Sequence, residues 1–185
     1  MRTRLLNVIM WMMIACLGYA QAQETKEMTR EEKKAEQEAL DRFYFEEAKK
    51  AIEDKAFVLE ADQVMFKYGT TAFVSSNTNF VAVKGDEAVV QVAFNVPVSG
   101  PNGIGGVTVS GSISGYKKEV DKKGTIRISM NVMGTGISAQ VDITLPEGGN
   151  RATVHIMPTF NSNRFTLSGN VLPMSKANVY QGRTL

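Results

Sequence analysis

Few side chains in this sequence are of the types that perform acid–base, nucleophilic or metal chemistry. His155 is the only histidine, and it stands in "ATVHIM" out of phase with Val154 and Ile156, which predicts a position on the polar face of a strand. Asp142 could complete a Ser-His-Asp arrangement, but no GxSxG motif accompanies it. The only cysteine, Cys16, lies in a stretch with the pattern of an export signal and would be removed with it, and there is no second histidine, so a zinc site would depend on carboxylates, which zinc sites rarely do. We therefore expect no catalytic residues, no metal site and no cofactor.

Two pairs of carboxylates are spaced closely enough for acid–base chemistry, Glu60 with Asp62 and Asp86 with Glu87. The first pair alternates with apolar residues, which predicts one polar strand face, and the second lies in the charged turn "KGDE". Neither setting indicates a buried carboxyl group with a raised pKa. We interpret both pairs as solvated and expect a protein that is not an enzyme.

The stretch "GPNGIGG" at 100–106 has the glycine content of a phosphate-binding loop. Such a loop needs a defined glycine spacing and a helix directly after it, because the phosphate sits at the helix N-terminus. Here the spacing does not match, and "VTVSGSISGY" follows with the alternation of a strand. We therefore predict a corner between two strands. Gly111 and Gly115, inside the next strand, indicate a bulge or a tight bend.

Residues 1–22 have the pattern of an export signal, with a positive start, a short apolar run and an "AQA" cleavage site. "MIAC" weakly resembles the box before a lipid-modified cysteine, so a lipid anchor at Cys16 is the alternative. Removing Arg2 and Arg4 from the 21 basic residues leaves 19, equal to the 19 acidic ones, which gives no support for nucleic-acid binding. We expect an exported protein without a transmembrane span, located in the periplasm, associated with the outer membrane or secreted.

After the signal, we predict a charged segment at 23–52 and an all-β domain at 53–185. In the charged segment "TREE" fits a capping box between Thr29 and Glu32, and a helical stripe of apolar residues follows at Leu40, Phe43, Tyr44, Ala48, Ala51 and Ile52. The later period of two predicts about nine strands near 57–66, 70–74, 79–84, 87–95, 106–118, 124–133, 136–145, 150–157 and 164–172. The expected fold class is mainly β: an antiparallel meander that forms a barrel-like or two-sheet sandwich domain, preceded by one N-terminal α-helix.

Strict alternation of strand direction would sort the loops into two ends. "KYGT", "KGDE", "DKKG" and "EGGN" would form a charged end, and "SSNT", "VPVSGPNGIG", "MGTG" and "PTFNSN" an uncharged one. Loops on a rigid scaffold often carry binding sites, so the uncharged rim is the predicted ligand surface. Its candidate ligand-binding residues are Asn77, Asn79, Asn102, Ile104, Phe160, Asn161, Asn163 and Arg164.

Five stretches together resemble the family called domain of unknown function 4251. They are "SSNTNFV" (75–81), "GPNGIGGVTVSGSISGY" (100–116), "NVMGTGISAQVDITLPEGGNRATV" (131–154), "FNSNRFTLSG" (160–169) and "NVYQGRTL" (178–185). The resemblance runs from about Ala51 to the C-terminus. It implies an exported protein of Gram-negative bacteria. It implies no activity and no site residues, because that family has no established function.

These observations favour a non-catalytic binding module of the cell envelope. A small apolar ligand would enter the strand-lined interior near Ile104 and Phe160, whereas a glycan would meet the amide-rich rim. The alternative is a protein-interaction or assembly component of the envelope, with the N-terminal helix as a docking arm. The expected partner is therefore an unknown small ligand or an envelope protein.

Overall fold

The computed structural model describes residues 29–93, 106–159 and 164–182. The predicted signal peptide, with Cys16, lies outside the described residues, as do the predicted site residues Asn102, Ile104, Phe160, Asn161 and Asn163. The chain divides into two compact units, residues 1–36 and 37–185. The whole β domain belongs to the second unit.

Helix α2 (Arg30–Glu53) begins with the predicted capping box. The Thr29 backbone N–H donates to Glu32 Oε2 at 2.8 Å, and the Glu32 N–H donates to Thr29 Oγ1 at 3.3 Å, so two donors without helical partners are satisfied. The second half of α2 buries Phe45, Ala48, Ala51 and Ile52. Three other members of the predicted stripe remain exposed, namely Leu40, Phe43 and Tyr44.

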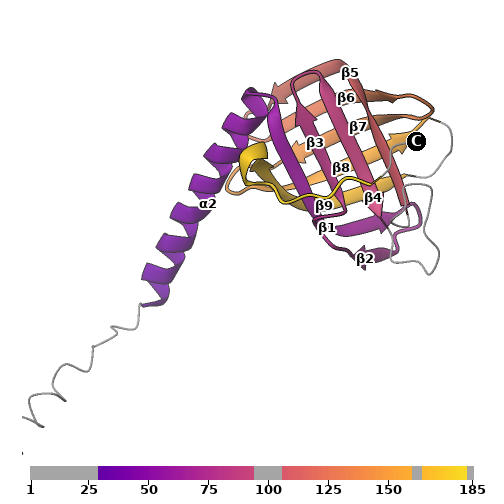
Figure 1. The fold of residues 1–185 in the computed structure, drawn as a ribbon. Helices are drawn as coiled ribbons and strands as arrows, with labels where there is room; N and C mark the ends of the chain where they lie inside the picture. Colours follow the sequence, from indigo (N-terminus) through magenta and orange to yellow (C-terminus); the bar gives the residue numbers. More distant parts are fainter. Residues whose placement is uncertain (1–28, 94–105, 160–163, 183–185) are drawn as a thin grey trace, which may run out of the picture. The chain divides into compact units, whose positions relative to one another are not determined.

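Eight strands form a closed antiparallel barrel, and a ninth short strand lies beside it (Figure 1). The barrel order is β1-β3-β4-β5-β6-β7-β8-β9, and β9 pairs back with β1 to close it. The mainly β meander with one N-terminal helix is thereby confirmed, in its barrel form. The strands are β1 (Ala56–Phe66), β2 (Thr71–Phe73), β3 (Phe80–Lys84), β4 (Glu87–Ala93), β5 (Gly106–Val120), β6 (Ile126–Gly134), β7 (Ser138–Leu145), β8 (Arg151–Pro158) and β9 (Phe165–Pro173), followed by the 3₁₀ turn η1 (Met174–Lys176).

Strands β2 and β3 both pair with β1, one after the other along its length. Met65 lies opposite Thr71 in β2, and Glu60 lies opposite Phe80 in β3. The chain therefore does not reverse between these two strands, and the predicted sorting of loops was wrong at this point. The turn "KYGT" belongs to the end where β8 leads to β9, and "SSNT" lies along the side of the barrel. The rim predicted to be uncharged consequently carries Lys67.

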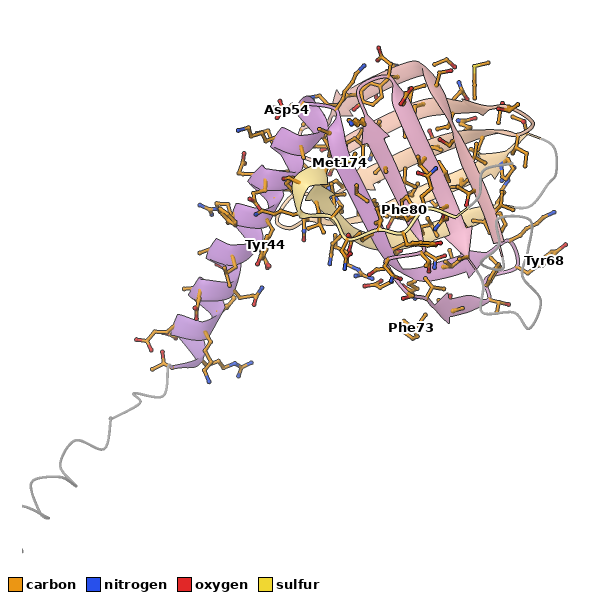
Figure 2. All side chains as sticks on the ribbon, in the orientation of Figure 1. Tyr44, Asp54, Tyr68, Phe73, Phe80 and Met174 are labelled. Carbon is orange, nitrogen blue, oxygen red and sulfur yellow. The ribbon has the colours of Figure 1, made fainter. Side chains whose placement is uncertain are left out.

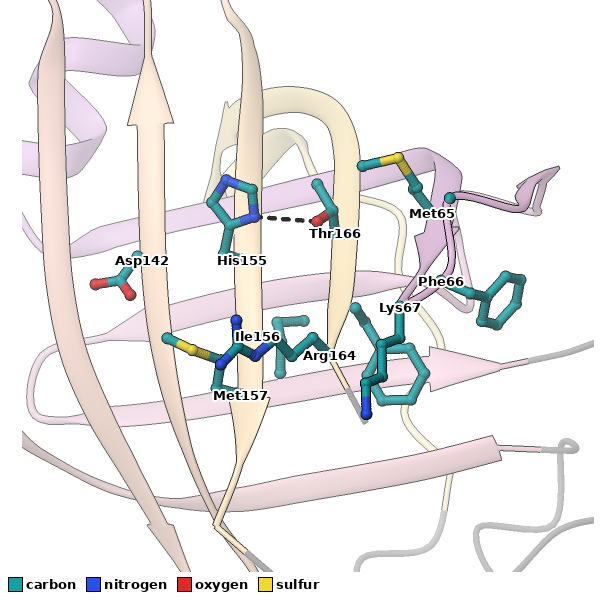
Figure 3. A pocket seen from close by; sticks show the side chains of 11 residues that line it. Met65, Phe66, Lys67, Asp142, His155, Ile156, Met157, Arg164 and Thr166 are labelled. Carbon is teal, nitrogen blue, oxygen red and sulfur yellow. Dashed lines mark hydrogen bonds between the residues drawn. The ribbon is translucent and has the colours of Figure 1, made fainter. Parts of the chain in front are cut away.

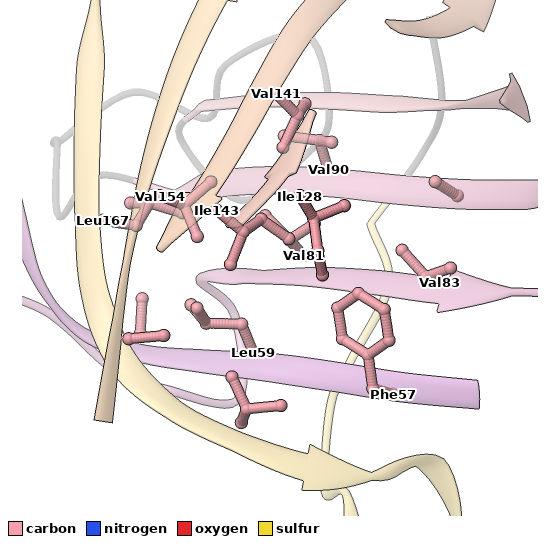
Figure 4. Packing of buried hydrophobic residues seen from close by; sticks show 14 of the residues in the cluster. Phe57, Leu59, Val81, Val83, Val90, Ile128, Val141, Ile143, Val154 and Leu167 are labelled. Atoms are coloured by element: carbon pink, nitrogen blue, oxygen red, sulfur yellow. The ribbon is translucent and has the colours of Figure 1, made fainter. Parts of the chain in front are cut away.

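The barrel interior is filled by apolar side chains from its strands (Figure 4). Phe57, Leu59, Ile128, Ile143 and Leu167 are among the largest, and each is at most 2% exposed. Alternation places these residues inward, because successive side chains of a strand point to opposite faces. The buried residues of α2 belong to the same cluster, so the helix covers the end of the barrel at which β1 begins. We call this the helix end, and the other end the opposite end.

Of the two glycines singled out in β5, Gly115 is the predicted bulge, whereas Gly111 lies in regular register and marks a close approach of β6. Gly115 has φ +64° and lies where the β5–β6 register shifts between Ser114 and Lys117, so one extra residue is inserted in β5. A Cβ at Gly111 would overlap the carbonyl oxygen of Met133 on β6. Gly106, the last residue of "GPNGIGG", begins β5, which pairs antiparallel with β4, while the predicted corner at 100–105 lies outside the described residues.

The residues 177–182, which we call the C-terminal strap, cross the outer face of the barrel. Gln91 of β4 is 0% exposed although it points outward, and its side-chain amide holds the strap. Gln91 Nε2 donates to the Tyr180 carbonyl at 2.7 Å, and the Gly182 N–H donates to Gln91 Oε1 at 2.7 Å. The remaining capacity of this amide is used by Thr78 O and Thr108 Oγ1.

Further strap contacts follow a period of two. The Asn178 N–H donates to Glu60 Oε1, and the Tyr180 N–H donates to the Asn77 carbonyl, both at 2.7 Å. Alternate backbone groups of an extended chain point to the same side, which explains this spacing. Phe80, opposite Gln91 on the same outward face, is 1% exposed, because this part of the barrel lies under the strap.

Candidate binding site on the outer face of the barrel

A row of polar side chains crosses four neighbouring strands on the outer face. Ser129 lies opposite Asp142, Asp142 opposite His155, and His155 opposite Thr166, so β6, β7, β8 and β9 contribute one residue each. Directly opposite residues of antiparallel strands have Cβ atoms roughly 4.5–5.5 Å apart, so these side chains are neighbours. The row ends at Met65 of β1, opposite Thr166. The exposed position of His155 confirms its predicted place on a polar strand face.

Hydrogen bonds fix the side chains of this row (Figure 3). Ser129 Oγ donates to Asp142 Oδ1 at 2.6 Å, and Gln140 Nε2 donates to Asp142 Oδ2 at 3.1 Å. His155 Nδ1 lies 3.0 Å from Thr166 Oγ1, with the donor set by the tautomer. The serine hydroxyl thus engages the acid directly rather than the imidazole, an order that differs from a nucleophile–base–acid relay.

A pocket of about 380 Å³ opens along this row, at the opposite end of the barrel from α2. This volume lies within the range of about 300–1,000 Å³ typical of small-molecule sites. The β1–β2 turn, β7, β8 and the start of β9 contribute its walls. The lining residues are Met65, Phe66, Lys67, Gly69, Asp142, His155, Ile156, Met157, Arg164, Phe165 and Thr166.

Phe66 and Phe165 reach the pocket from the barrel interior, because they alternate with the outward residues Met65 and Thr166 and pack against the core. The rings of Phe66 and Phe165 pack edge to face, with centroids 6.3 Å apart and planes at 75°. These residues lie opposite each other where β1 and β9 close the barrel. The apolar lining side chains that share the outward face with the polar row are Met65 and Met157.

The charges of the pocket lining are two cations, one carboxylate and one imidazole. Lys67 and Arg164 are the cations, and Asp142 is the carboxylate. Each oxygen of Asp142 already accepts a hydrogen bond from within the row. Figure 3 shows the Arg164 side chain extending across β8 beside Met157, on the side toward Asp142. Among the described lining residues there is thus one more cationic side chain than there are carboxylates.

The predicted site residues that the structure describes lie in two separate places. Arg164 lines the pocket, whereas Asn77 and Asn79 lie on the side of the barrel beside β1. Asn79 is 1% exposed, and its side chain donates to the Ser75 carbonyl and accepts from the Ala93 N–H. A ligand would reach Asn79 only by displacing these contacts.

Sequence reasoning did not combine the other pocket residues into one site. Alternation placed Asp142 and His155 on polar faces, but only the strand register puts them opposite each other. Lys67 was predicted at the wrong end of the barrel. Strands β2 and β3 pair with β1 one after the other, and no local sequence pattern indicates this arrangement. In the described ranges, no group of three or more His, Cys, Asp or Glu side chains is placed to hold a metal ion.

The comparisons with known proteins agree with this architecture. The family model described as "Domain of unknown function (DUF4251)" matches residues 39–171. The chain belongs to the DUF4251 family. A crystal structure of a DUF4251 protein from Bacteroides eggerthii is 52% identical in sequence, with a TM-score of 0.69, and the match covers 80% of this chain and 99% of that chain. The predicted resemblance is therefore confirmed, and the family has no known function.

Two further findings concern this DUF4251 protein. No curated protein matches the chain. Among helices in the described ranges, none combines the length and the apolar character needed to cross a bilayer.

Proposed function

We propose that this DUF4251 protein is a non-catalytic binding module of the cell envelope, and that the pocket beside His155 is its ligand site. One observation carries the proposal: hydrogen-bonding and cationic side chains converge on a pocket with an apolar wall, on rigid neighbouring strands. This combination is typical of sites that orient small ligands. The cell-envelope location follows from the export pattern of residues 1–22.

The chemistry of the pocket fits a ligand that carries hydroxyl groups and an apolar face, as a glycan does. Thr166, His155 and Asp142 offer donors and acceptors along one line, and Met65 and Met157 offer an apolar surface beside them. The alternative place for an apolar ligand, the barrel interior, is occupied by packed side chains of the core. The outer pocket is therefore the better supported site.

Native mass spectrometry of the mature protein, purified gently from its own envelope, tests this proposal. We expect an excess mass that disappears on denaturation and that is absent from a His155→Ala, Thr166→Ala variant. A His155 variant is informative because this exposed side chain contributes little to packing. A matched Thr144→Ala variant on β7, outside the pocket lining, should keep the ligand. If the unmodified protein and the Thr144→Ala variant are both fully folded and both have the mass of the bare chain, the proposal is contradicted.

A second candidate function is assembly with another envelope protein through α2. Leu40, Phe43 and Tyr44 are exposed on the helix, and Phe43 is 55% exposed. Next to them, a hollow of about 600 Å³ lies between α2 and η1, and its Lys176 sits 5.9 Å from the Phe43 ring centroid. Apolar side chains that stay exposed beside a hollow are typical of protein-interaction sites. Tyr44 and Met174, labelled in Figure 2, mark the helix and η1 on this side.

Replacing Leu40, Phe43 and Tyr44 together by serine distinguishes the two functions. An assembly component should lose a stoichiometric partner in native mass spectrometry, whereas a ligand-binding module should keep its small ligand. The matched control replaces Arg42, Glu46 and Lys50, three exposed charged residues of the same helix, by serine. If the control loses the partner as well, the apolar face is not the reason for the interaction.

A further inference from the structure

We infer that the pocket ligand is a neutral saccharide, and that two adjacent hydroxyl groups of its ring bridge Asp142 and Arg164. This inference rests on the proposed function and specifies the class of its ligand. Both side chains line the pocket, and the Arg164 side chain extends across β8 toward Asp142 on β7 (Figure 3). The Arg164 guanidinium forms no hydrogen bond or ion pair with Asp142 or with any other described residue. The two opposite charges therefore border a space in which a ligand can contact both.

The charges that border this space favour an uncharged ligand. Asp142 is the one carboxylate among the described lining residues, and Arg164 extends toward it. The other cation, Lys67, has a partner outside the polar row, because its Nζ lies 5.6 Å from the centroid of the Tyr68 ring. A carboxylate on the ligand would be attracted by Arg164 and repelled by Asp142, and an ammonium group would meet the reverse. A neutral group is repelled by neither side chain.

Hydroxyl groups can satisfy both side chains, because each hydroxyl group is a donor and an acceptor at once. One hydroxyl group of the sugar can donate to an Asp142 oxygen while the adjacent one accepts from the Arg164 guanidinium. Ser129 and Gln140 each donate to one oxygen of Asp142, at 2.6 and 3.1 Å, which fixes the carboxylate and leaves lone pairs for the ligand. Hydrogen bonds with one ionised partner are about twice as strong as neutral ones, so these two bonds should dominate the affinity.

The rest of the pocket continues the same chemistry. His155 and Thr166 follow Asp142 on the next two strands, and each can bond a further hydroxyl group of the sugar. Met65 and Met157 share the outward face and provide a flexible apolar surface for the C–H groups of the ring. A zwitterionic amino acid could also pair with Asp142 and Arg164, but it would leave His155 and Thr166 without a ligand contact.

NMR titration of the isotope-labelled protein tests the inference with matched neutral, acidic and amino sugars. The probes are the methyl glycosides of glucose, galactose and mannose, each with the corresponding uronic acid and the corresponding 2-amino sugar. We expect at least one neutral sugar to bind about tenfold or more tightly than both of its charged counterparts, because one charge of the pair repels each of them. The amide signals of Asp142, His155 and Thr166 should shift on binding. Removing either bridging hydroxyl group from that sugar should weaken binding by about tenfold, since each one bonds a charged group.

Two variants separate the roles of the opposite charges. Asp142→Asn and Arg164→Gln should each weaken binding of the neutral sugar by about tenfold. Asp142→Asn should also remove the preference over the uronic acid, and Arg164→Gln the preference over the amino sugar, because each variant removes the repelling charge. A purely structural role would weaken all three ligands alike.

The matched control is Arg127→Gln, because Arg127 is an exposed arginine on β6 outside the pocket lining. This variant should leave all three affinities unchanged. Unchanged melting temperatures of all three variants show that the fold is retained. Sugar binding that responds equally to Arg127→Gln overturns the assignment to Asp142 and Arg164.

The outcomes separate this inference from the proposed function. Equal affinities for the neutral sugar and its uronic acid in the unmodified protein overturn the neutral ligand but support a saccharide site in the pocket. Binding of leucine, added as a zwitterionic probe, more tightly than any sugar overturns the saccharide and supports a small-ligand site of another class. Failure of every probe to bind overturns the inference, and the proposed function falls as well only if native mass spectrometry also shows the bare chain.

Discussion

The buried amide of Gln91 links the C-terminal strap to the barrel, and we expect Gln91→Leu to detach the strap. Gln91 makes four hydrogen bonds, two to the strap and two to Thr78 and Thr108. Leucine has a similar volume but makes none of these bonds. The strap groups, Tyr180 O and Gly182 N–H, would then have to find water, and the strap must leave the surface to do so.

The magnitude follows from which groups can reach water. The two strap groups become solvated on detachment, so each loss costs the net value of a hydrogen bond, about 0.5–1.5 kcal/mol. The Thr78 carbonyl and the Thr108 hydroxyl each lose one hydrogen bond to the amide as well, at about 0.5–1.5 kcal/mol per bond. The free energy of unfolding should therefore fall by about 2–6 kcal/mol.

Urea unfolding and amide hydrogen exchange measure the two parts of this prediction. The unfolding midpoint reports the loss of stability, and exchange at the Tyr180 and Gly182 amides reports detachment of the strap. Gln140→Leu is the matched control, because Gln140 is exposed and should change stability by less than about 0.5 kcal/mol. A loss below about 1 kcal/mol in Gln91→Leu, with both strap amides still protected, would refute the reasoning.

Three further predictions concern the closure and lining of the barrel. The hydrogen bond from Arg151 lowers the pKa of Asp62, so this pair stabilises the fold above the unfolded-state pKa of 3.8, and the stabilisation is lost as pH falls through the lower folded-state value. Since both side chains are about half exposed, Asp62→Asn should cost less than about 1 kcal/mol at pH 7 in urea unfolding, and the cost should shrink as pH falls below 3.8. Gly169→Ala should cost about 1–3 kcal/mol, because its Cβ would meet a backbone carbonyl of β1, whereas Gly149→Ala, with open space around it, should be neutral in the same assay. The buried Tyr116 hydroxyl has no hydrogen-bond partner within the described ranges, and burial raises its pKa. Tyr116→Phe should therefore leave the free energy of unfolding unchanged or raise it by up to about 1 kcal/mol, with a melting temperature that stays the same or rises. A clear loss of stability would show that the hydroxyl has a partner.

The candidate site shows how far local patterns reach. Alternation in "ATVHIM" was sufficient to place His155 outward, because the two faces of a strand differ in every second residue. The composition of Thr29 to Glu32 was sufficient for the capping box, because its two hydrogen bonds join residues three positions apart. Neither pattern predicts that Lys67 and Arg164 line the same pocket, because their positions depend on how distant strands pair.

The sequence by itself determined the elements: one capped helix, nine strands close to their observed bounds, and a bend at Gly115. These features follow from interactions between residues near each other in the chain. Only the tertiary structure decided that β9 closes on β1, that β2 and β3 share one side of β1, and that Gln91 binds the strap. Each of these contacts is selected by the total energy of many alternative pairings between distant segments, and no single segment carries that information.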